Sequence, residues 1–250
     1  MQATTDTQAT LRTAFDTAER IVFLTGAGMS TESGIPDFRS PTGLYAGGVN
    51  EDVFDIDIFR SRPEVFYEFA HRFLDTVRRA RPNAGHLAMA ALARRPGTRV
   101  DVITQNIDTL HQDAGSPLVH PVHGTLATSR CVRCEAQVPT SDLWPAIEAG
   151  TVPRHLCGGV FKPEIVFFGE PLPEVAFTAA EYAVRKADLL VIAGTSLAVY
   201  PAAGLPQGRS RACRLVVINR SPTPLDAEAD LVFSDSIGAV LSVAVPETAA

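Results

Sequence analysis

Residues 21–28 read Ile-Val-Phe-Leu-Thr-Gly-Ala-Gly, an apolar run that stops at two closely spaced glycines. A short apolar run bounded by glycine is typical of a strand that is buried on both faces. The segment Gly26-Ala27-Gly28 would also let backbone amides approach a phosphate where a larger side chain would collide. The usual dinucleotide-binding fingerprint has a third glycine three positions later, but Thr31 stands there. The stretch therefore predicts a buried strand that ends in either a phosphate-binding loop or an ordinary tight turn.

The same kind of run recurs along the chain. Four further runs predict strands, at residues 100–104, 189–193, 215–218 and 231–233. Helical patterns lie between several of them. The clearest is at 174–187, where one face of the predicted helix would hold Val175, Phe177, Ala180, Ala183 and Val184. Buried strands that alternate with helices predict an α/β fold in which helices cover both faces of a parallel sheet.

Two stretches interrupt this alternation. Residues 40–95 carry Phe, Arg and Glu at helical spacing, with Pro63 and Pro82 placed where helices could begin. Residues 126–163 carry three of the four cysteines and no long periodic run. We interpret both as inserts that form a smaller lobe, one helical and one ribbon-like. The larger domain would then comprise residues 1–39, 96–125 and 164–250, with a loose polar leader over residues 1–10 and a helix at 11–20.

Composition narrows the class of protein. Of the 250 residues, 46% are hydrophobic and 20% charged, which suits a chain that buries a sizeable core. The formal net charge of −6 gives no overall attraction to nucleic acid or to an anionic membrane. Four cysteines are too few for a disulfide scaffold, no apolar run is long enough to span a bilayer, and the start does not read as a secretory signal. We therefore expect a cytoplasmic protein.

Polar side chains follow the first predicted strand. Ser30, Ser33, Asp37, Phe38 and Arg39 place hydroxyls, a carboxylate, an aromatic ring and a guanidinium in one segment, in which Pro36 opposes a regular helix. This composition suits a loop that closes over a polar ligand. The alternative is a surface ion pair between the carboxylate and the guanidinium.

Polar residues also follow the other strands. Gln105, Asn106, Ile107 and Asp108 come after the strand at 100–104, and ligands of open parallel sheets collect at the carboxyl ends of strands. The amide of Asn106 and the carboxylate of Asp108 would suit a carboxamide, although Asp108 could instead be the N-cap of a short helix. Gly194, Thr195 and Ser196 follow a third strand, and Asn219 follows a fourth. Together they indicate one ligand along one edge of the sheet.

Two histidines, His120 and His123, lie close together without a carboxylate nearby in the sequence. Imidazole titrates near neutrality and can take a proton from a hydroxyl, so either residue is a candidate general base. A metal pair is a weaker interpretation, because Pro121 opposes the helix that would place both rings on one face. A plain turn residue is the remaining alternative.

The pair Cys131 and Cys134 has the spacing of a zinc knuckle, and Cys157 supplies a third thiol. Arg154 stands three residues before Cys157, where a fourth cysteine would complete the set, and it is no zinc ligand. The neighbouring His155 could serve instead with altered geometry. The alternative is a packed insert without metal. Cys213 precedes a predicted strand and is expected to be a buried apolar residue.

Taken together, these segments resemble the sirtuins, the NAD-dependent protein lysine deacylases. The resemblance covers approximately residues 21–241. It rests on motifs that follow in the family's order: 26–30, 33–39, 104–108, 110–111, 123–124, 168–170, 194–197 and 218–219. It implies a Rossmann-like larger lobe, a smaller lobe with a helical and a zinc-binding insert, and a cleft between them for NAD and acyl-lysine.

The resemblance also implies a role for each motif. The NAD contacts would come from Gly26, Ala27, Gly28, Ser30, Ser33, Asp37, Phe38, Arg39, Gln105, Asn106, Ile107, Asp108, Gly194, Thr195, Ser196, Asn219 and Ser236. Asn106 and Asp108 would hold the nicotinamide carboxamide while the acyl oxygen attacks the ribose and expels nicotinamide. His123 would then deprotonate a ribose hydroxyl, and the acyl group would pass to ADP-ribose. The substrate peptide would add as a strand to Val166, Phe167, Phe168, Gly169 and Glu170.

This sequence departs from the family's pattern at three places. Arg154 stands where the fourth zinc cysteine usually lies, and Thr109 stands where glycine is common. Sirtuins that prefer malonyl or succinyl lysine have a tyrosine and an arginine after the first motif. In this sequence the stretch of residues 40–59 contains Tyr45 but no arginine. We therefore expect an uncharged acyl group. The alternatives are a protein ADP-ribosyltransferase and a non-catalytic NAD sensor, and a metal hydrolase lacks a suitable ligand set.

Overall fold

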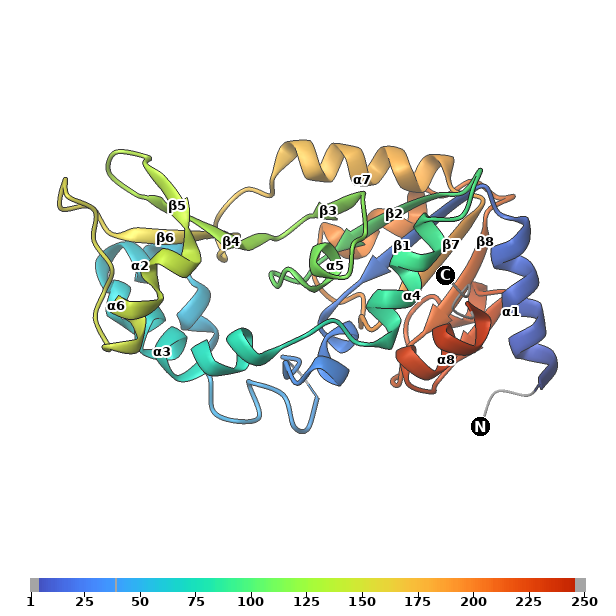
Figure 1. Ribbon diagram of the computed structural model, residues 1–250, viewed down its shortest axis with the longest axis horizontal. Coiled ribbons are helices and arrows are strands. Elements are labelled where there is room, and N and C mark those ends of the chain that lie inside the picture. Colours follow the sequence, from blue (N-terminus) through green and yellow to red (C-terminus); the bar gives the residue numbers. More distant parts are fainter. Residues whose placement is uncertain (1–4, 39, 246–250) are drawn as a thin grey trace.

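Six parallel strands form the sheet of the larger lobe (Figure 1). The structure is a computed structural model and describes residues 5–38 and 40–245. The strands are β1 (Arg20–Thr25), β2 (Arg99–Thr104), β3 (Val119–Pro121), β7 (Leu189–Ala193), β8 (Arg214–Ile218) and β9 (Leu231–Phe233). They lie in the order β3-β2-β1-β7-β8-β9, and every neighbouring pair is parallel. The strand order reverses between β1 and β7, which is where a Rossmann-like sheet binds its ligands.

The five strands predicted from apolar runs are confirmed, and β3 is an addition. It is a short edge strand whose three residues are only half-buried, so it carries no apolar run that the sequence could reveal. Pro121 ends it without cost to the sheet, because an edge strand has no partner for the missing N–H on its outer side.

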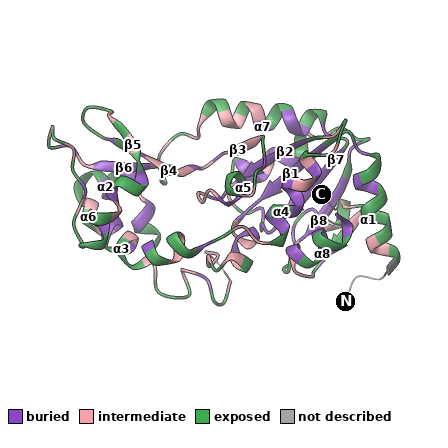
Figure 2. Cartoon of the chain, in the orientation of Figure 1, coloured by how far each residue is buried: buried purple, intermediate pink, exposed green. Residues whose placement is uncertain are grey.

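Helices cover both faces of the sheet, as predicted. On one face, α1 (Thr5–Thr17), α4 (Ala84–Ala93) and α8 (Ile237–Ala244) pack around Phe23 and Val191. On the other face, α7 (Glu174–Lys186) and a 3-10 helix at Ala202–Gly208 pack around Leu24 and Leu190. Figure 2 shows the strands buried and the outer helical surfaces exposed. The alternate side chains of β1, β7 and β8 therefore enter two separate cores.

The predicted loose leader was wrong for residues 5–10, because α1 already begins at Thr5. The first turns of this helix are polar because they face solvent, and the threonine hydroxyls donate to carbonyls four residues earlier. The helix is held by Leu11 and Phe15, which are buried against the sheet. Residues 1–4 lie outside the described part.

The helix predicted at 174–187 is confirmed as α7, and Ala180, Ala183 and Val184 are buried as expected. Val175 is not part of that face, because its side chain is 86% exposed. It lies in the first turn, at the end of α7 nearest the smaller lobe (Figure 1). A helical stripe predicts which residues share a side of the helix, but not how far along the helix the sheet extends.

The smaller lobe combines two short layers. One holds α2 (Ile56–Ser61) and α3 (Pro63–Arg79), which begins at the predicted proline. The other is an antiparallel sheet in the order β5-β4-β6, formed by β4 (Gly124–Cys131), β5 (Gln137–Pro139) and β6 (Phe161–Ile165). The helix α6 (Trp144–Glu148) lies between β5 and β6 in the chain and packs against α3. Edge-to-face ring contacts join the layers, and Phe167 lies 5.3 Å from Phe59 and 6.1 Å from Phe54 between ring centroids.

One helix of the stretch 40–95 packs on the larger lobe. This is α4, whose Met89 and Leu92 are buried in the same core as α1 and α8. Its N-cap is Asn83, directly after Pro82. The remaining helix, α5 (Leu110–Asp113), follows β2. No helix in the described part of the chain has both the length and the apolar character required to cross a bilayer.

Candidate active site

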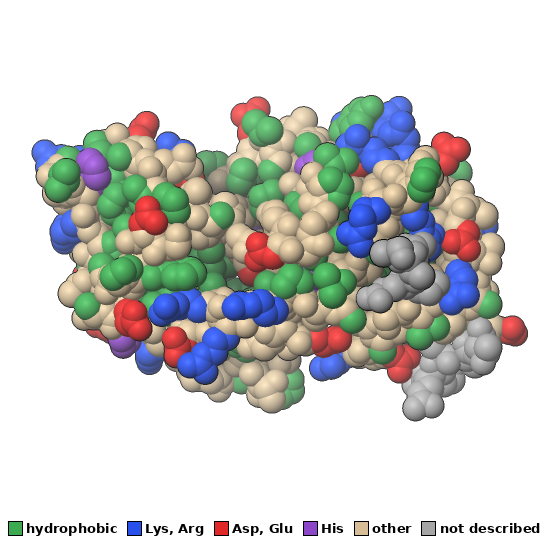
Figure 3. Space-filling model, viewed as in Figure 1, with side chains coloured by type: hydrophobic (Ala, Val, Ile, Leu, Met, Phe, Trp, Pro, Cys, Tyr) green, Lys and Arg blue, Asp and Glu red, His purple; other side chains and the backbone are tan. Residues whose placement is uncertain are grey.

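A cavity of about 1340 Å³ lies between the lobes, at the carboxyl ends of β1, β2, β7 and β8. Figure 3 shows the surface hollowed between the two lobes. The cavity brings together nearly all of the residues that the sequence predicts as NAD and peptide contacts, from segments up to 210 positions apart. Arg39 lies outside the described residues. Ser33 does not line the cavity, because its hydroxyl accepts a hydrogen bond from Asn83 Nδ2 at 3.0 Å.

The glycines after β1 and β7 pack backbone against backbone. The N–H of Gly28 donates to the carbonyl oxygen of Gly194 at 2.9 Å. A Cβ added to Gly28 would lie 2.9 Å from Gly194 Cα, which is closer than real Cβ atoms approach. Gly194 also has a φ of +66°, in the left-handed region. The two loops therefore need glycine to meet each other, whatever ligand they also approach.

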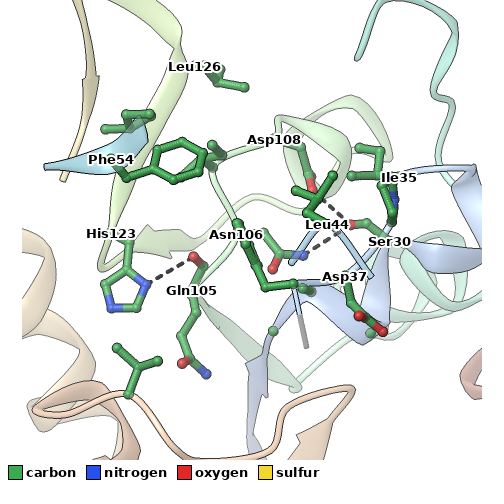
Figure 4. Close-up of a pocket in the computed structure, with 18 of the residues that line it drawn as sticks. Ser30, Ile35, Asp37, Leu44, Phe54, Gln105, Asn106, Asp108, His123 and Leu126 are labelled. Atoms are coloured by element: carbon green, nitrogen blue, oxygen red, sulfur yellow. Dashed lines mark hydrogen bonds between the residues drawn. The ribbon is translucent and has the colours of Figure 1, made fainter. Parts of the chain in front are cut away.

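A hydrogen-bonded chain of three polar side chains joins the segment after β1 to the segment after β2 (Figure 4). Asn106 Nδ2 donates to Ser30 Oγ at 3.0 Å, and Ser30 Oγ donates to Asp108 Oδ2 at 2.8 Å. Ser30 is 1% exposed and Asn106 8% exposed. Such a satisfied chain fixes the directions of the amide and the carboxylate before a ligand arrives.

Asp108 lies at the cavity wall, one residue before Thr109, which is the N-cap of α5, so the alternative that made Asp108 itself the N-cap was wrong. Its Oδ1 accepts the N–H of Leu110 at 3.1 Å, at the start of α5, while Oδ2 faces Ser30. Burial raises the pKa of Asp108, and the hydrogen bonds from Ser30 and Leu110 oppose that rise. The group therefore combines a structural contact with a carboxylate oxygen at the cavity wall.

His123 is half-buried and lines the cavity just after β3. Its Nδ1 lies 3.1 Å from the carbonyl oxygen of Gln105 (Figure 4). A carbonyl only accepts, so Nδ1 carries the proton and Nε2 keeps its lone pair. Burial lowers the pKa of His123, and the hydrogen bond to Gln105 offsets only part of this shift. A neutral imidazole with an unprotonated Nε2 is able to accept a proton.

His120 has a different environment, and the sequence was misleading here. Its Nε2 lies 2.8 Å from Asp101 Oδ1, so it does have a carboxylate partner, on the neighbouring strand β2. Asp101 is 4% exposed and also accepts two hydrogen bonds from Arg99. His120 is therefore a member of a structural ion-pair cluster and does not line the cavity.

The ribbon-like part of the smaller lobe gathers a metal-ligand set of Cys131, Cys134, His155 and Cys157, whose ligand atoms all lie within 4.8 Å of one another. The sulfurs of Cys131 and Cys157 are 3.6 Å apart, and Cys134 Sγ is 3.2 Å from His155 Nδ1. Two ligands on one tetrahedral zinc ion are roughly 3.3–3.8 Å apart. The residues therefore fit a structural zinc ion held by three thiolates and one imidazole.

The backbone explains why His155 takes the fourth place. Its N–H and C=O bond to Gly159 and Gly158 in a tight turn, which carries the imidazole toward Cys134. Arg154 instead donates from Nη1 to the carbonyl of Gly158 at 3.2 Å. No sequence spacing signals this shift by one residue.

Two features of the site escaped the sequence. Asn83, at the N-cap of α4, donates from Nδ2 to the carbonyl of Met29 at 2.8 Å and so holds the loop after β1 from outside the cavity. The cavity also extends into the smaller lobe, where it is lined by apolar residues of α3, of α6 and of the turn before α6: Phe66, Phe69, Phe73, Leu74, Leu143 and Ile147. The phenylalanines of α3 were noted in the sequence only as part of the helical spacing of residues 40–95.

Comparison with known proteins gives the family. The model of the Sir2 family matches residues 26–201. The chain belongs to the Sir2 family. An NAD-dependent protein deacetylase of Thermotoga maritima is 45% identical over 85% of this chain and 87% of its own length. One of Cutibacterium acnes is also 45% identical, over 88% of this chain and 90% of its own length.

Solved Sir2 structures agree in fold over nearly the whole chain. A Sir2 variant with a deacetylated p53 peptide and 3′-O-acetyl ADP-ribose has a TM-score of 0.89 at 38% identity, covering 99% of both chains. Sir2Tm bound to a propionylated peptide has a TM-score of 0.83 at 39% identity, covering 94% of this chain and 95% of that one. The Rossmann-like sheet and the smaller lobe are therefore those of the Sir2 family.

Proposed function

We propose that this chain is an NAD-dependent protein lysine deacylase, which transfers the acyl group from lysine to ADP-ribose and releases nicotinamide. The observation that carries the proposal is the position of His123 in the same cavity as the buried Asn106, Ser30 and Asp108 chain. The relatives named above as NAD-dependent protein deacetylases, and the Sir2 complex with acetyl ADP-ribose, support it.

The larger lobe binds NAD along the carboxyl edge of the sheet. Asn106 and Asp108 hold the nicotinamide carboxamide, which offers one acceptor and two donors to an amide and a carboxylate. The loop that begins at Gly26 binds the pyrophosphate and ribose, and the adenosine half is bound by Gly194, Thr195, Ser196, Asn219 and Ser236. All of these residues line the one cavity.

The reaction needs no protein nucleophile. The acyl oxygen of the substrate attacks the anomeric carbon of the nicotinamide ribose, and the bond to nicotinamide breaks. His123 Nε2 then takes the proton of a ribose hydroxyl, whose oxygen attacks the imidate carbon. Water adds to the same carbon and its bond to nitrogen breaks, so that the acyl group stays on the sugar and lysine leaves as the free amine. The lowered pKa of His123 keeps the imidazole neutral at pH 7, so that it is ready to act as the base.

The acyl group is uncharged. Among the described residues that line the cavity, the only Lys or Arg is Arg220, which follows β8 in the larger lobe. The smaller-lobe end is apolar, and an acyl carboxylate buried there would have no cation to pair with. The peptide backbone pairs with Val166–Glu170, where Phe168 is 46% exposed at the rim.

The zinc ion would be held by Cys131, Cys134, His155 and Cys157, and its chemistry there is structural. It joins the turn between β4 and β5 to the segment before β6. We place the protein in the cytoplasm, in keeping with the absence of any disulfide among its four cysteines.

The test is mass spectrometry of an acetyl-lysine peptide incubated with purified protein, with and without NAD. We expect loss of the acetyl group only with NAD, with one nicotinamide and one acetyl ADP-ribose formed for each peptide. ADP-ribose on a protein target, with the acetyl group retained, would indicate an ADP-ribosyltransferase. NAD bound without nicotinamide release would indicate a sensor. Either result would overturn the proposal.

A further inference from the structure

A buried ammonium group lies under the segment that we propose as the peptide-pairing strand. Lys162, the second residue of β6, has a side chain that is only 12% exposed. Its Nζ lies 2.7 Å from the carbonyl oxygen of Ile165, 3.3 Å from that of Pro163 and 2.8 Å from Glu170 Oε2. An ammonium has three protons, so its whole donor capacity is used within eight residues of chain.

The carboxylate of Glu170 continues the contact into the segment. The oxygen that faces Lys162 also accepts the N–H of Phe167 at 2.9 Å, and the N–H of Glu170 donates to the carbonyl of Phe167 at 3.0 Å. The ring of Phe167 lies 4.2 Å from Lys162 Nζ, in a cation–π contact. We call Lys162, Phe167 and Glu170 the β6 clamp. It closes the turn on itself through side chains and backbone together.

The clamped segment reaches the reacting part of the cavity. Its Val166 N–H donates to the carbonyl of His123 at 2.9 Å. On its other side, Phe168 pairs with the smaller lobe, donating to Phe54 and accepting from Ile56. The shape of residues 165–170 therefore sets the spacing between the histidine and the aromatic wall.

Lys162 acts at a distance from the substrate. It does not line the cavity, whereas all five residues of 166–170 do. Burial lowers the pKa of Lys162, and the neighbouring Glu170 carboxylate opposes that shift. An apolar side chain at this position would avoid the desolvation cost of a buried charge, so the pair does not serve stability alone.

We propose that Lys162 is a positioning residue, which acts with Glu170 to hold residues 165–170 in the conformation that pairs with the substrate peptide. The inference rests on the proposed function. It also gives the Glu170 carboxylate a role through the N–H of Phe167, while the backbone of Glu170 stays in the segment proposed to pair with the peptide.

The experiment compares Lys162→Met, Lys162→Arg and Glu170→Gln in the full chain. For each we would measure kcat, KM for an acetyl-lysine peptide, KM for NAD and Tm. The control is Arg130→Met, because Arg130 on β4 is 47% exposed and its side-chain hydrogen bonds go to Glu164 on β6 and to the carbonyl of Glu135.

For Lys162→Met and Glu170→Gln we expect the peptide KM to rise about tenfold, as for a partly buried charge pair that loses one partner, since the two side chains are 12% and 24% exposed. KM for NAD should stay within about twofold, since the NAD side belongs to the larger lobe. Lys162→Arg keeps the charge and should recover part of the peptide affinity. The control should leave the peptide KM unchanged.

A second measurement separates this inference from the proposed function. Fluorescence anisotropy of a labelled acetyl-lysine peptide reports binding without turnover. Normal peptide binding and an unchanged peptide KM in Lys162→Met would overturn the inference, while NAD-dependent deacylation by the unmodified protein would leave the function intact. Equal increases in both KM values with a lowered Tm would also overturn it, because that pattern indicates a general loss of structure.

Discussion

On the side of the larger lobe, the cavity wall consists of backbone and small polar side chains at the ends of β1, β2 and β7, whereas the smaller lobe presents aromatic and aliphatic side chains. The polar wall is held by hydrogen bonds between neighbouring strand ends, such as those around Ser30. The apolar wall is held by ring packing, by the β6 clamp and by the cysteine cluster.

The conformations of the two walls are therefore stabilised in different ways. A parallel sheet fixes the directions of its strand ends, so the polar wall inherits its geometry from a large core. The smaller lobe has a short sheet and few helices, and a small core of this kind needs a metal or similar cross-link to stay folded. Treatments that remove the cross-link should therefore affect one wall and spare the other.

Loss of the metal should have the largest effect. Cys131→Ser, or treatment with a strong chelator, should unfold the smaller lobe, because structural zinc contributes on the order of 10 kcal/mol to the folding of small domains. We expect lost zinc by mass spectrometry, a shifted emission of Trp144 in α6 and lost peptide turnover, with NAD binding retained. Cys213→Ser is the control, since that thiol is buried away from the cluster. A variant that keeps both its zinc and its fold would contradict the assignment.

The next largest effect should come from His123, the residue that we propose as the base. His123→Ala should lower deacylation by about a thousandfold, within the usual range for removing a general base. NAD affinity and Tm should change little, because His123 has only one hydrogen bond from its ring to the fold. A deacylation assay would measure the rate, calorimetric titration would measure the NAD affinity, and thermal unfolding would measure Tm. Turnover within about tenfold of the unmodified protein would remove the imidazole from the mechanism.

A smaller effect should appear as pH dependence of the larger lobe. His86 and His111 are both buried, with ring centroids 4.6 Å apart. Burial lowers the pKa of His86 to about 4. Burial, with a smaller contribution from His86, lowers the pKa of His111 to about 3. The unfolded chain takes up protons below pH 6.5 while the folded chain does not, so stability is present above that pH and falls as the pH drops further.

Each of the two histidines should cost up to about 1.4 kcal/mol per pH unit between pH 6.5 and its folded pKa. The unfolding free energy would be measured in urea, with hydrogen exchange of the β1 and β2 amides as the probe. These amides report on the larger lobe, so release of zinc from the smaller lobe in acid would not affect the result. His111→Gln should flatten the slope by up to half. An equally steep slope in that variant would show that other groups carry the pH dependence.

The smallest effect should concern the apolar wall. Ala70→Trp on α3 would fill the part of the cavity that extends into the smaller lobe. We expect kcat/KM for an octanoyl-lysine peptide to fall about tenfold relative to that for acetyl-lysine. A loss of this size is typical when an apolar pocket no longer has room for part of an acyl chain. Glu68→Trp, exposed on the same helix, is the control. Equal losses for both acyl lengths would show that the extension does not receive the acyl chain.

Much of the fold was predictable because buried elements have recognisable apolar patterns in the local sequence. Strands such as β1 and β7 read as apolar runs, since both of their faces are covered. The helix α1 and the edge strand β3 were missed or misplaced because they are partly exposed, and exposed segments carry weak periodicity. The residues after the strands were found for a related reason, since strand ends converge at one edge of the sheet.

The α/β class, the order of the polar segments and the residue types that meet in the cavity follow from the sequence alone. Three pairings become visible only in the folded chain: His120 with Asp101, His155 with the cysteine cluster, and Lys162 with the ring of Phe167. The partners in each pairing lie on separate segments, and their side chains meet only because those segments fold toward each other. Local patterns record whether a residue is buried, but the partner of a buried charge or ligand depends on how separate segments turn toward one another.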